Sequence, residues 1–374
     1  MTKSVGIGLI GAGFMGRCHA NAFRSVAGLF DVPVAPELIS LADVTDEAAR
    51  DSAKALGFAE GTGDWRRLID DPRIGIVAIT APNSLHEEMA IAAIEAGKTV
   101  YCEKPLSVTT QSARRMTEAA SAADVVTMVG FNFLRNPMIK LAREIIASGE
   151  IGDVTGFRGI HAENYMADPE VPHSFRTDPA GGGALADIGS HIISMARYLL
   201  GPIAEVMAAQ ATVVPTRPAS RGDTRRVPVT VDDRTVMLCR FERGIIGSIE
   251  ANWTATGRKM QLDFEVTGSK GAIAFTQERM NELLLMKPTA RGRDGFARIE
   301  AGPEHEPYGR FCPAPGHHLG FNDLKVIEVA ELLDAHAGKV KASPDFQEAL
   351  EVQKVVEAAA MSAASRAYVA VDAI

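Results

Sequence analysis

Clustered cysteines and long apolar runs are both missing from this chain. The sequence has four cysteines in 374 residues, and they stand far apart, at positions 18, 102, 239 and 312. This spacing argues against a disulfide framework or a zinc site, and we expect reduced thiols and no metal. No apolar run approaches the roughly 18 uncharged residues of a membrane span. The first predicted strand begins almost at Met1, which leaves no room for a secretory signal, so we expect a cytoplasmic protein.

An excess of positive charge is also missing. Lys and Arg number 39 against 47 Asp and Glu, for a formal net charge of -8. This balance argues against nucleic acid or an anionic membrane as a partner, and it leaves small neutral substrates open. Hydrophobic residues make up 46% and charged residues 23%, which is typical of a globular protein. The length predicts two domains of roughly 100–200 residues each.

The first 130 residues alternate short apolar runs with helical patterns. Strands are predicted at residues 5–10, 38–42, 74–80, 99–102 and 125–129, and helices at 15–25, 46–56, 64–69, 84–96 and 109–122. This βαβ rhythm is typical of a parallel sheet covered on both faces. Ser84 and Thr109 are expected to cap their helices, and Gly97 to end one.

The rhythm changes after Gly130, so we predict domains at 1–130 and 131–374. Helices are expected at 137–148, 183–200, 318–337 and 346–368, and strands at 154–164, 204–214, 227–241, 245–254, 260–267, 271–276 and 282–286. Several of these strands alternate apolar and polar residues, as an antiparallel sheet with one buried face does. Residues 215–226 and 287–315 are predicted loops. The fold class is therefore α/β, a dinucleotide-binding domain followed by an open-sheet domain.

A glycine motif stands at the first strand-to-helix junction. Residues 5–10 are apolar and run into Gly11-x-Gly13-x-x-Gly16, with helical residues after it. Gly11 permits the tight turn, Gly13 lets the backbone approach a pyrophosphate, and Gly16 allows close helix packing. The helix N-terminus then offers N–H groups to the phosphates. We expect the residues within the motif, Phe14 and Met15, to contact the same cofactor.

The second predicted strand ends in an acidic residue, Asp43. It lies 27 residues after Gly16, beyond the usual interval of about 20, and we attribute the difference to an insertion at 27–37. A carboxylate there accepts hydrogen bonds from ribose hydroxyls and repels a 2′-phosphate, which favours NAD over NADP. The alternative is that Asp43 only starts a turn or caps the helix at Asp46.

Further cofactor contacts are expected where the later strands end. Thr80, Pro82 and Asn83 follow the strand at 74–80, at the carboxyl edge where parallel sheets bind ligands. A plain strand-to-helix turn, capped by Asn83 or Ser84, explains them nearly as well. The other expected cofactor contacts are His86, Glu103 and Lys104.

Lys104 directly follows the strand at 99–102. A lysine at this edge can donate a hydrogen bond to a substrate hydroxyl and stabilise the developing alkoxide. Pro105 stiffens the turn that presents it. The alternative is a surface lysine paired with Glu103.

Asp187 and His191 stand four residues apart on the predicted helix at 183–200, so they share a face. A carboxylate orients an imidazole, and an imidazole is suited to removing a hydroxyl proton near neutral pH. The alternative is a helix-start aspartate and an unrelated histidine. The glycines at 181–183 favour the functional reading, because they permit close approach of the backbone to a ligand. Substrate contacts are expected from Lys104, Asn132, Arg135, Asn164, Asp187 and His191.

Together these motifs resemble the glucose–fructose oxidoreductase, inositol dehydrogenase and rhizopine-catabolism (Gfo/Idh/MocA) family. The resemblance rests on the glycine motif, Glu103-Lys104-Pro105, Gly130-Phe131-Asn132 and the run from Gly181 to His191. It implies a Rossmann domain, an open and mostly antiparallel second sheet, and a homodimer or homotetramer formed through that sheet.

The resemblance also implies an NAD-dependent oxidation of a sugar, inositol or related polyol to a ketone. Lys104 would then polarise the hydroxyl, His191 would act as general base, and Asp187 would orient it. Two alternatives stay open. One is a redox-neutral glycoside hydrolase that keeps NAD bound, and the other is a non-catalytic sugar or NAD sensor.

Overall fold

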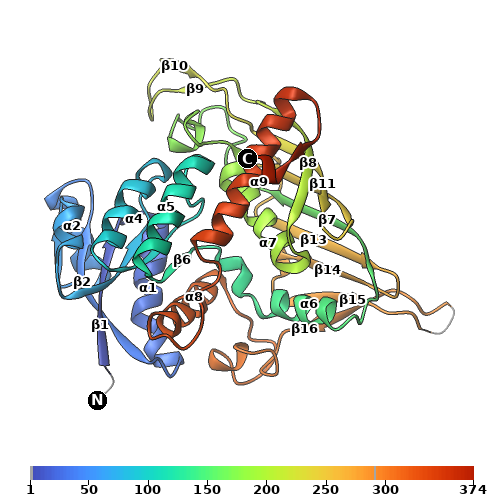
Figure 1. Ribbon diagram of the computed structural model, residues 1–374, viewed down its shortest axis with the longest axis horizontal. Coiled ribbons are helices and arrows are strands. Elements are labelled where there is room, and N and C mark those ends of the chain that lie inside the picture. Colours follow the sequence, from blue (N-terminus) through green and yellow to red (C-terminus); the bar gives the residue numbers. More distant parts are fainter. Residues whose placement is uncertain (1–2, 290–291) are drawn as a thin grey trace. The chain divides into compact units, whose positions relative to one another are not determined.

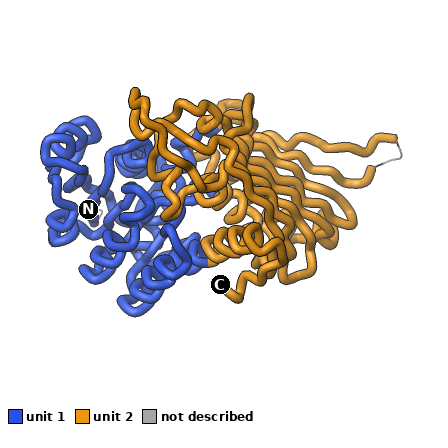
Figure 2. Tube along the Cα trace, turned by 90° about the horizontal axis from the view of Figure 1, so that it is seen from above, with its two compact units in different colours: residues 1–135, 319–350 blue, residues 136–318, 351–374 orange. Residues whose placement is uncertain are grey.

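The chain forms two compact units, and each unit is made of two separate stretches of the sequence. A computed structural model describes residues 3–289 and 292–374. Unit 1 comprises residues 1–135 and 319–350, and unit 2 comprises residues 136–318 and 351–374 (Figure 2). From the sequence, residues 319–350 were expected in the second domain. They belong to unit 1 because helix α8 (Phe321–His336) packs on α1 (Phe14–Leu29), where Phe14 and Phe321 stack with ring centroids 5.8 Å apart.

Unit 1 is built on a six-stranded parallel sheet (Figure 1). The spatial order is β3-β2-β1-β4-β5-β6, which is the doubly wound order of a dinucleotide-binding domain. The strands are β1 (Lys3–Ile10), β2 (Val34–Ala42), β3 (Glu60–Thr62), β4 (Ile74–Ile79), β5 (Thr99–Cys102) and β6 (Thr127–Val129). The helices besides α1 and α8 are α2 (Asp46–Leu56), α3 (Trp65–Ile69), α4 (His86–Glu95) and α5 (Thr110–Ala123). The predicted Rossmann fold is confirmed.

Several local predictions in unit 1 need correction. The expected insertion at 27–37 is mostly regular structure, because α1 continues to Leu29 and β2 already begins at Val34. The short strand β3 was missed, since three residues carry no detectable alternation. Ser84 caps no helix: it lies inside a 3₁₀ turn, Asn83–Leu85, that leads into α4. Thr109 does cap α5, and Gly97 takes a φ of +70° just after α4.

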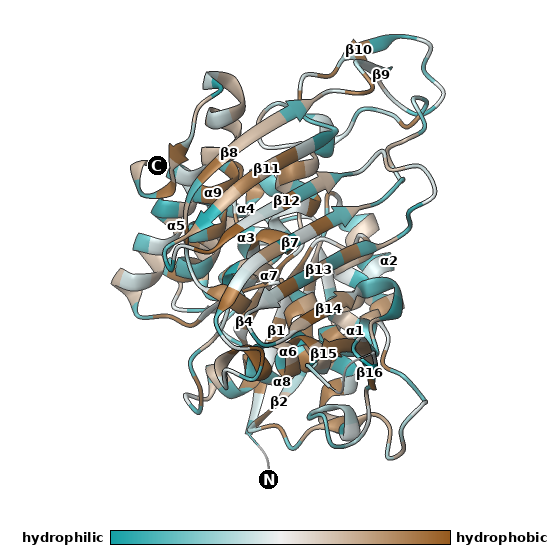
Figure 3. Ribbon diagram, turned by 90° about the vertical axis from the view of Figure 1, so that its right-hand side faces the viewer, coloured by the Kyte–Doolittle hydropathy of each residue, from teal (hydrophilic) through white to brown (hydrophobic). Residues whose placement is uncertain are grey.

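Unit 2 is built on a nine-stranded sheet in the order β16-β15-β14-β13-β7-β12-β11-β8-β17. Among the described residues of this nine-stranded sheet, only the pair β7–β12 is parallel, which confirms a mostly antiparallel sheet. The strands are β7 (Val154–Ala162), β8 (Ile203–Ala211), β11 (Arg234–Phe241), β12 (Ile246–Asn252), β13 (Gln261–Gly268), β14 (Ala272–Thr276), β15 (Glu282–Met286), β16 (Phe296–Glu300) and β17 (Val369–Ala370). Helices α6 (Pro137–Ala147) and α7 (Ser190–Leu200) lie behind the sheet in Figure 3, as does α9 (Phe346–Ser365), and the opposite face is turned toward the viewer.

Three predictions in unit 2 were wrong in detail. The expected strand at 227–241 is two strands, β10 (Arg226–Pro228) and β11, and β10 pairs with β9 (Thr216–Pro218) inside an expected loop. The expected loop at 287–315 contains β16, and its residues 290–291 lie outside the described residues. The expected helix at 183–200 begins with a π-helical turn, Leu185–Gly189, and becomes α-helical only at Ser190.

Candidate active site

The glycine loop of unit 1 forms a cradle at the end of β1. Gly11 has a φ of +95°, and its N–H donates to the carbonyl of Ala42 at 2.8 Å. A Cβ on Gly16 would lie 2.1 Å from the Gly11 oxygen, so the fold itself requires glycine there. A Cβ on Gly13, in contrast, would have no described atom within 4 Å. The space beside Gly13 is therefore open in the described protein, as the predicted pyrophosphate contact requires.

Helix α1 presents its N-terminus to this cradle. Gly13 is its N-cap, no side chain of the described residues caps it, and its first turn has no acidic residue. Phe14, the first helical residue, is 71% exposed, whereas Met15 is half-buried. An uncapped helix start with a positive dipole end is suited to an anionic phosphate group.

Asp43 lies one residue beyond β2, at the carboxyl edge of the sheet. Its carboxylate accepts a hydrogen bond from the Val44 N–H at 2.7 Å. It does not cap α2, because Thr45 holds the N-cap and accepts from Ala48 N–H at 3.2 Å. The capping alternative is therefore wrong, and the position stays suited to ribose recognition.

His86 joins two of the predicted cofactor turns. Its Nδ1 lies 3.0 Å from the carbonyl oxygen of Pro105, and its Nε2 lies 2.9 Å from that of Ala81. Burial lowers the pKa of His86, which favours the neutral ring, and a neutral ring donates to only one of the two carbonyls. Thr80 supports the same edge, since its hydroxyl donates to the Gly11 carbonyl at 2.8 Å. His86 thus fixes the turn that presents Lys104, next to Pro82 and Asn83.

Glu103 is engaged inside unit 1 and is 5% exposed. Its Oε1 lies 2.9 Å from Lys325 Nζ and 2.7 Å from His19 Nε2. Burial alone would raise the pKa of Glu103, but the charge of Lys325 and the hydrogen bond from His19 lower it below its ordinary value. Lys104 is half-buried, not a surface side chain. The alternative of an exposed Lys104–Glu103 pair is therefore not favoured.

Lys325 connects this cluster to α8. Its ammonium lies 2.6 Å from Glu328 Oε2 and 3.0 Å from the Tyr101 hydroxyl, and Tyr101 in turn donates to Glu328. Burial opposes the charged form of Lys325, yet Glu103 and Glu328 raise its pKa. No sequence signal pointed to this network, because Glu103 lies 222 residues from the lysine and Glu328 only 3.

In unit 2, Gly182 and Gly183 make close contacts with protein groups. A Cβ on Gly182 would lie 2.2 Å from the Arg176 carbonyl oxygen, and one on Gly183 would lie 2.2 Å from Asp232 Oδ1. Asp232 also accepts from Leu185 N–H at 2.9 Å, which fixes the start of the π-helical turn. These glycines are thus explained by packing within unit 2, where the sequence analysis had expected approach to a ligand.

The π-helical turn carries Asp187, and His191 follows on the first turn of α7. Asp187 Oδ2 accepts from the Tyr165 hydroxyl at 2.8 Å and from Arg176 Nε at 3.0 Å. His191 is buried, and its ring centroid lies 5.6 Å from that of His161, whose Nδ1 lies 2.7 Å from the Ile188 carbonyl. π-Helical turns occur frequently at functional sites. Nothing in the local sequence predicted the partners Tyr165 and Arg176, since β7 and a loop bring them to the turn.

The expected substrate residues differ in their surroundings. Asn132 is buried, and its Nδ2 has no partner among the described residues. Arg135 is bound within unit 1 by Glu331 and the carbonyl of Ser343, which is a structural arrangement. Asn164 accepts from Lys259 Nζ at 3.4 Å.

Two properties of the described residues bear on the kind of site. Across residues 3–289 and 292–374, no group of three or more His, Cys, Asp or Glu side chains is placed to hold a metal ion. Nor does any helix in these ranges have the length and apolar character needed to cross a membrane. The four cysteines, all of them described, form no disulfide.

A doubly wound domain with a glycine loop at the start of its first helix, followed by an open-sheet domain that carries Asp187 on a π-helical turn and His191 on the next helix, is typical of a nucleotide-dependent oxidoreductase. The model of the oxidoreductase family with an NAD-binding Rossmann fold matches residues 5–131, and that of the GFO/IDH/MocA C-terminal domain matches residues 139–274. The chain belongs to the GFO/IDH/MocA family. Its first domain binds NAD.

The chain is similar over its full length to levoglucosan dehydrogenase of Pseudarthrobacter phenanthrenivorans. The two are 38% identical over 388 aligned residues, which cover 100% of this chain and 99% of the relative. A solved levoglucosan dehydrogenase in complex with NADH and L-sorbose has a TM-score of 0.95 at 38% identity, covering 99% of each chain. Myo-inositol 2-dehydrogenase of Thermotoga maritima is 29% identical, covering 75% of this chain and 77% of its own.

Proposed function

We propose that this protein uses NAD to oxidise a secondary hydroxyl of a sugar, inositol or related cyclic polyol to a ketone. The observation that carries the proposal is the likeness to levoglucosan dehydrogenase across 100% of the chain, at 38% identity. The buried His191 beside Asp187, in a family whose first domain binds NAD, supports it chemically.

The residues of unit 1 hold the cofactor in this proposal. The cradle at Gly13 and the start of α1 bind the pyrophosphate. Asp43 binds the adenosine ribose and disfavours a 2′-phosphate, so NAD is preferred to NADP. When bound, NAD supplies the hydride acceptor for the oxidised carbon. Thr80 and His86 act indirectly, by fixing the turns around the cradle and Lys104.

Three side chains handle the substrate hydroxyl. Lys104 donates a hydrogen bond to the hydroxyl oxygen and stabilises negative charge on it. His191 removes the hydroxyl proton as general base, and Asp187 orients the base and contacts the substrate. Asn132 provides a buried amide donor whose hydrogen bond the described protein does not supply. Asn164, beyond the end of β7, is a further substrate contact in this proposal.

A substrate panel tests the proposal directly. The purified protein is incubated with NAD, and separately with NADP, across levoglucosan, inositols, aldoses and glycosides, while the absorbance of reduced nicotinamide is followed. Reduction of NAD with one stereochemical set is the expected result. If no substrate of the panel reduces NAD or NADP, and NAD is found already bound to the purified protein, a redox-neutral reaction is favoured instead.

Two variants test the assigned roles. Lys104→Ala and His191→Ala are each expected to reduce kcat by roughly 10²–10⁴-fold, the usual contribution of acid–base groups. Lys140→Ala, on the exposed side of α6, is the matched control and is expected to keep the wild-type rate. Wild-type rates in both site variants would remove Lys104 and His191 from the mechanism.

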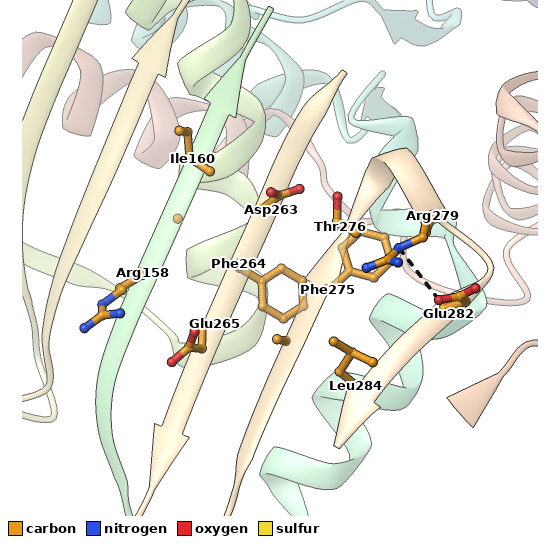
Figure 4. Close-up of a pocket in the computed structure, with 12 residues that line it drawn as sticks. Arg158, Ile160, Asp263, Phe264, Glu265, Phe275, Thr276, Arg279, Glu282 and Leu284 are labelled. Atoms are coloured by element: carbon orange, nitrogen blue, oxygen red, sulfur yellow. Dashed lines mark ion pairs between the residues drawn. The ribbon is translucent and has the colours of Figure 1, made fainter. Parts of the chain in front are cut away.

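We further propose that the protein forms a homodimer or homotetramer through the open face of the nine-stranded sheet. Apolar side chains are exposed there on neighbouring strands, with Met207, Val236, Leu238 and Ile246 between 38% and 58% exposed. The same face is hollowed by about 330 Å³ over β7, β13 and β14, where Arg158, Asp263 and Glu265 are among the lining residues (Figure 4). Sedimentation of Leu238→Lys beside the wild type tests this, and an unchanged assembly would contradict it.

A further inference from the structure

Asp187 is held by two side chains that come from separate segments of unit 2. Tyr165 lies three residues beyond β7, and Arg176 lies in the 3₁₀ turn Phe175–Thr177. Both donate to the same carboxylate oxygen, Oδ2, at 2.8 Å and 3.0 Å. The Arg176 guanidinium also lies 5.9 Å from the centre of the Tyr165 ring. The two donors are therefore neighbours of each other as well as of Asp187.

The loop that carries Arg176 is itself fixed on both sides. The carbonyl of Arg176 accepts a hydrogen bond from Gly183 N–H at 2.8 Å. The backbone and the side chain of Arg176 therefore both bind the segment that carries Asp187. On the other side, the fully buried Arg217 of β9 donates to the carbonyls of Met166 and Asp168, at 2.7 Å and 3.0 Å. His173 N–H donates to the Pro218 carbonyl at 2.8 Å. The β9–β10 hairpin thus holds the loop in place. The surroundings of Asp187 are therefore fixed by hydrogen bonds from several segments of unit 2.

Stability alone does not explain this arrangement. Tyr165 is 36% exposed and the Arg176 side chain is 40% exposed, whereas the Asp187 side chain is only 13% exposed. Ion pairs with an exposed partner add little to folding stability, because water screens the charge and the long side chain loses freedom. Burial, followed by the charge of Asp187, raises the pKa of Tyr165, so its hydroxyl stays protonated and remains a donor. The effect of the two donors is then to fix the direction of the carboxylate.

We propose that Tyr165 and Arg176 are positioning residues that set the orientation of Asp187, and through it the geometry of the His191 base. This inference rests on the proposed function, in which Asp187 orients His191. Two donors on one oxygen leave the carboxylate few rotations. Removing either donor lets the carboxylate turn away from the productive direction, which slows the proton transfer without weakening cofactor binding.

A double-mutant cycle tests the inference. Tyr165→Phe and Arg176→Gln are made in the wild type and again in Asp187→Asn, and kcat, the KM for NAD and Tm are measured with the best substrate of the panel. We expect each single variant to lower kcat about tenfold with an unchanged KM for NAD and an unchanged Tm. In the Asp187→Asn background, neither substitution should reduce kcat further. Arg176→Lys, which keeps the charge without the Nε donor, should recover part of the loss.

Unit 2 offers a matched control pair. The guanidinium of Arg143 lies 4.3 Å from the centre of the Tyr198 ring, a contact of the same kind without Asp187. Tyr198→Phe and Arg143→Gln are expected to keep the wild-type kcat. A crystal structure of Tyr165→Phe gives a readout apart from activity, and it should show the Asp187 carboxylate rotated.

The possible outcomes separate the two proposals. If Asp187→Asn itself retains the wild-type rate, the proposed role of Asp187 fails and the inference fails with it. If Asp187→Asn is slow but Tyr165→Phe and Arg176→Gln are as fast as the wild type, only the inference is overturned. If the two variants lose the same factor in both backgrounds, they act on the substrate directly, and the positioning role is also overturned.

Discussion

Glu103 and Lys325 form a buried ion pair, 2.9 Å apart, although 222 residues separate them in the sequence. Glu103 directly precedes the predicted catalytic Lys104, and Lys325 lies in the segment that returns from unit 2. The pair therefore links the end of β5 to α8. Its neighbours Glu328, Tyr101 and His19 complete a network that is almost fully removed from water.

Replacing the cation of this network should be strongly destabilising. Lys325→Met leaves Glu103 and Glu328 buried without their positive partner, and we expect a loss of about 3–5 kcal/mol in the free energy of unfolding. Urea denaturation followed by fluorescence measures it. Lys341→Met is the control, because that side chain is 89% exposed and its loss should leave stability unchanged. A Lys325→Met protein as stable as the wild type would show that the network contributes nothing.

Stability should fall on the acid side of neutrality. Burial lowers the pKa of His19 and of His86 from 6.5, so protonating either ring favours the unfolded chain, and their contribution is lost as the pH falls below about that value. Glu103 adds a second loss below its ordinary pKa of 4.5, because Lys325 lowers its pKa in the fold. Lys325, whose pKa is raised, loses its contribution only above 10.5. Tm measured across this range should decline in acid, and less steeply in His86→Gln than in the exposed control His317→Gln.

The glycine loop allows binding and folding to be separated. Gly13→Ala places a methyl group in open space, so Tm should change by a few degrees at most while the Kd for NAD rises at least tenfold. Gly16→Ala places a methyl group 2.1 Å from the Gly11 oxygen and should lower Tm instead. Calorimetric titration with NAD and a thermal melt of both variants give the two readouts. Unchanged NAD affinity in Gly13→Ala would contradict the cradle.

Asp43 should govern the choice of cofactor. In Asp43→Ala the Kd for NAD should rise about tenfold, and the preference for NAD over NADP should shrink, because the carboxylate no longer binds the ribose or repels a 2′-phosphate. Direct binding measurements with both cofactors check this. Asp46→Ala, on the neighbouring helix, is the control. An unaltered preference in Asp43→Ala would remove that residue from cofactor recognition.

The sequence predicted the Rossmann sheet well because its strands are short, apolar and bounded by recognisable helix signals. The six-residue glycine motif and Asp43 each follow a predicted strand directly. Because parallel strands bring their carboxyl ends to one edge of the sheet, both could be placed at that edge from the sequence. The exact bounds of β5 and α2 followed from the same periodicity. The assignment of 319–350 failed because periodicity does not say on which sheet an amphipathic helix packs.

The surroundings of the proposed catalytic residues could not be predicted. The pairing of Asp187 with Tyr165 and Arg176 depends on how β7 and the following loop meet the π-helical turn, which no local pattern encodes. The π-helical turn itself has the same residue pattern as an α-helix. Likewise, Arg135 had the residue type of a substrate ligand, and only the structure shows that Glu331 and the Ser343 carbonyl bind it.

Unit 1 is discontinuous in the sequence, and this limits how the gene can be cut. A fragment ending at residue 135 keeps the whole six-stranded sheet and the glycine cradle, but it lacks the segment 319–350. Such a fragment exposes the apolar surface of α1 that α8 covers and leaves Glu103 without Lys325. The dinucleotide domain can therefore be produced alone only as a circular permutant or a fusion that joins residues 319–350 to residues 1–135. During synthesis it follows that this domain is completed only after nearly all of unit 2 has left the ribosome.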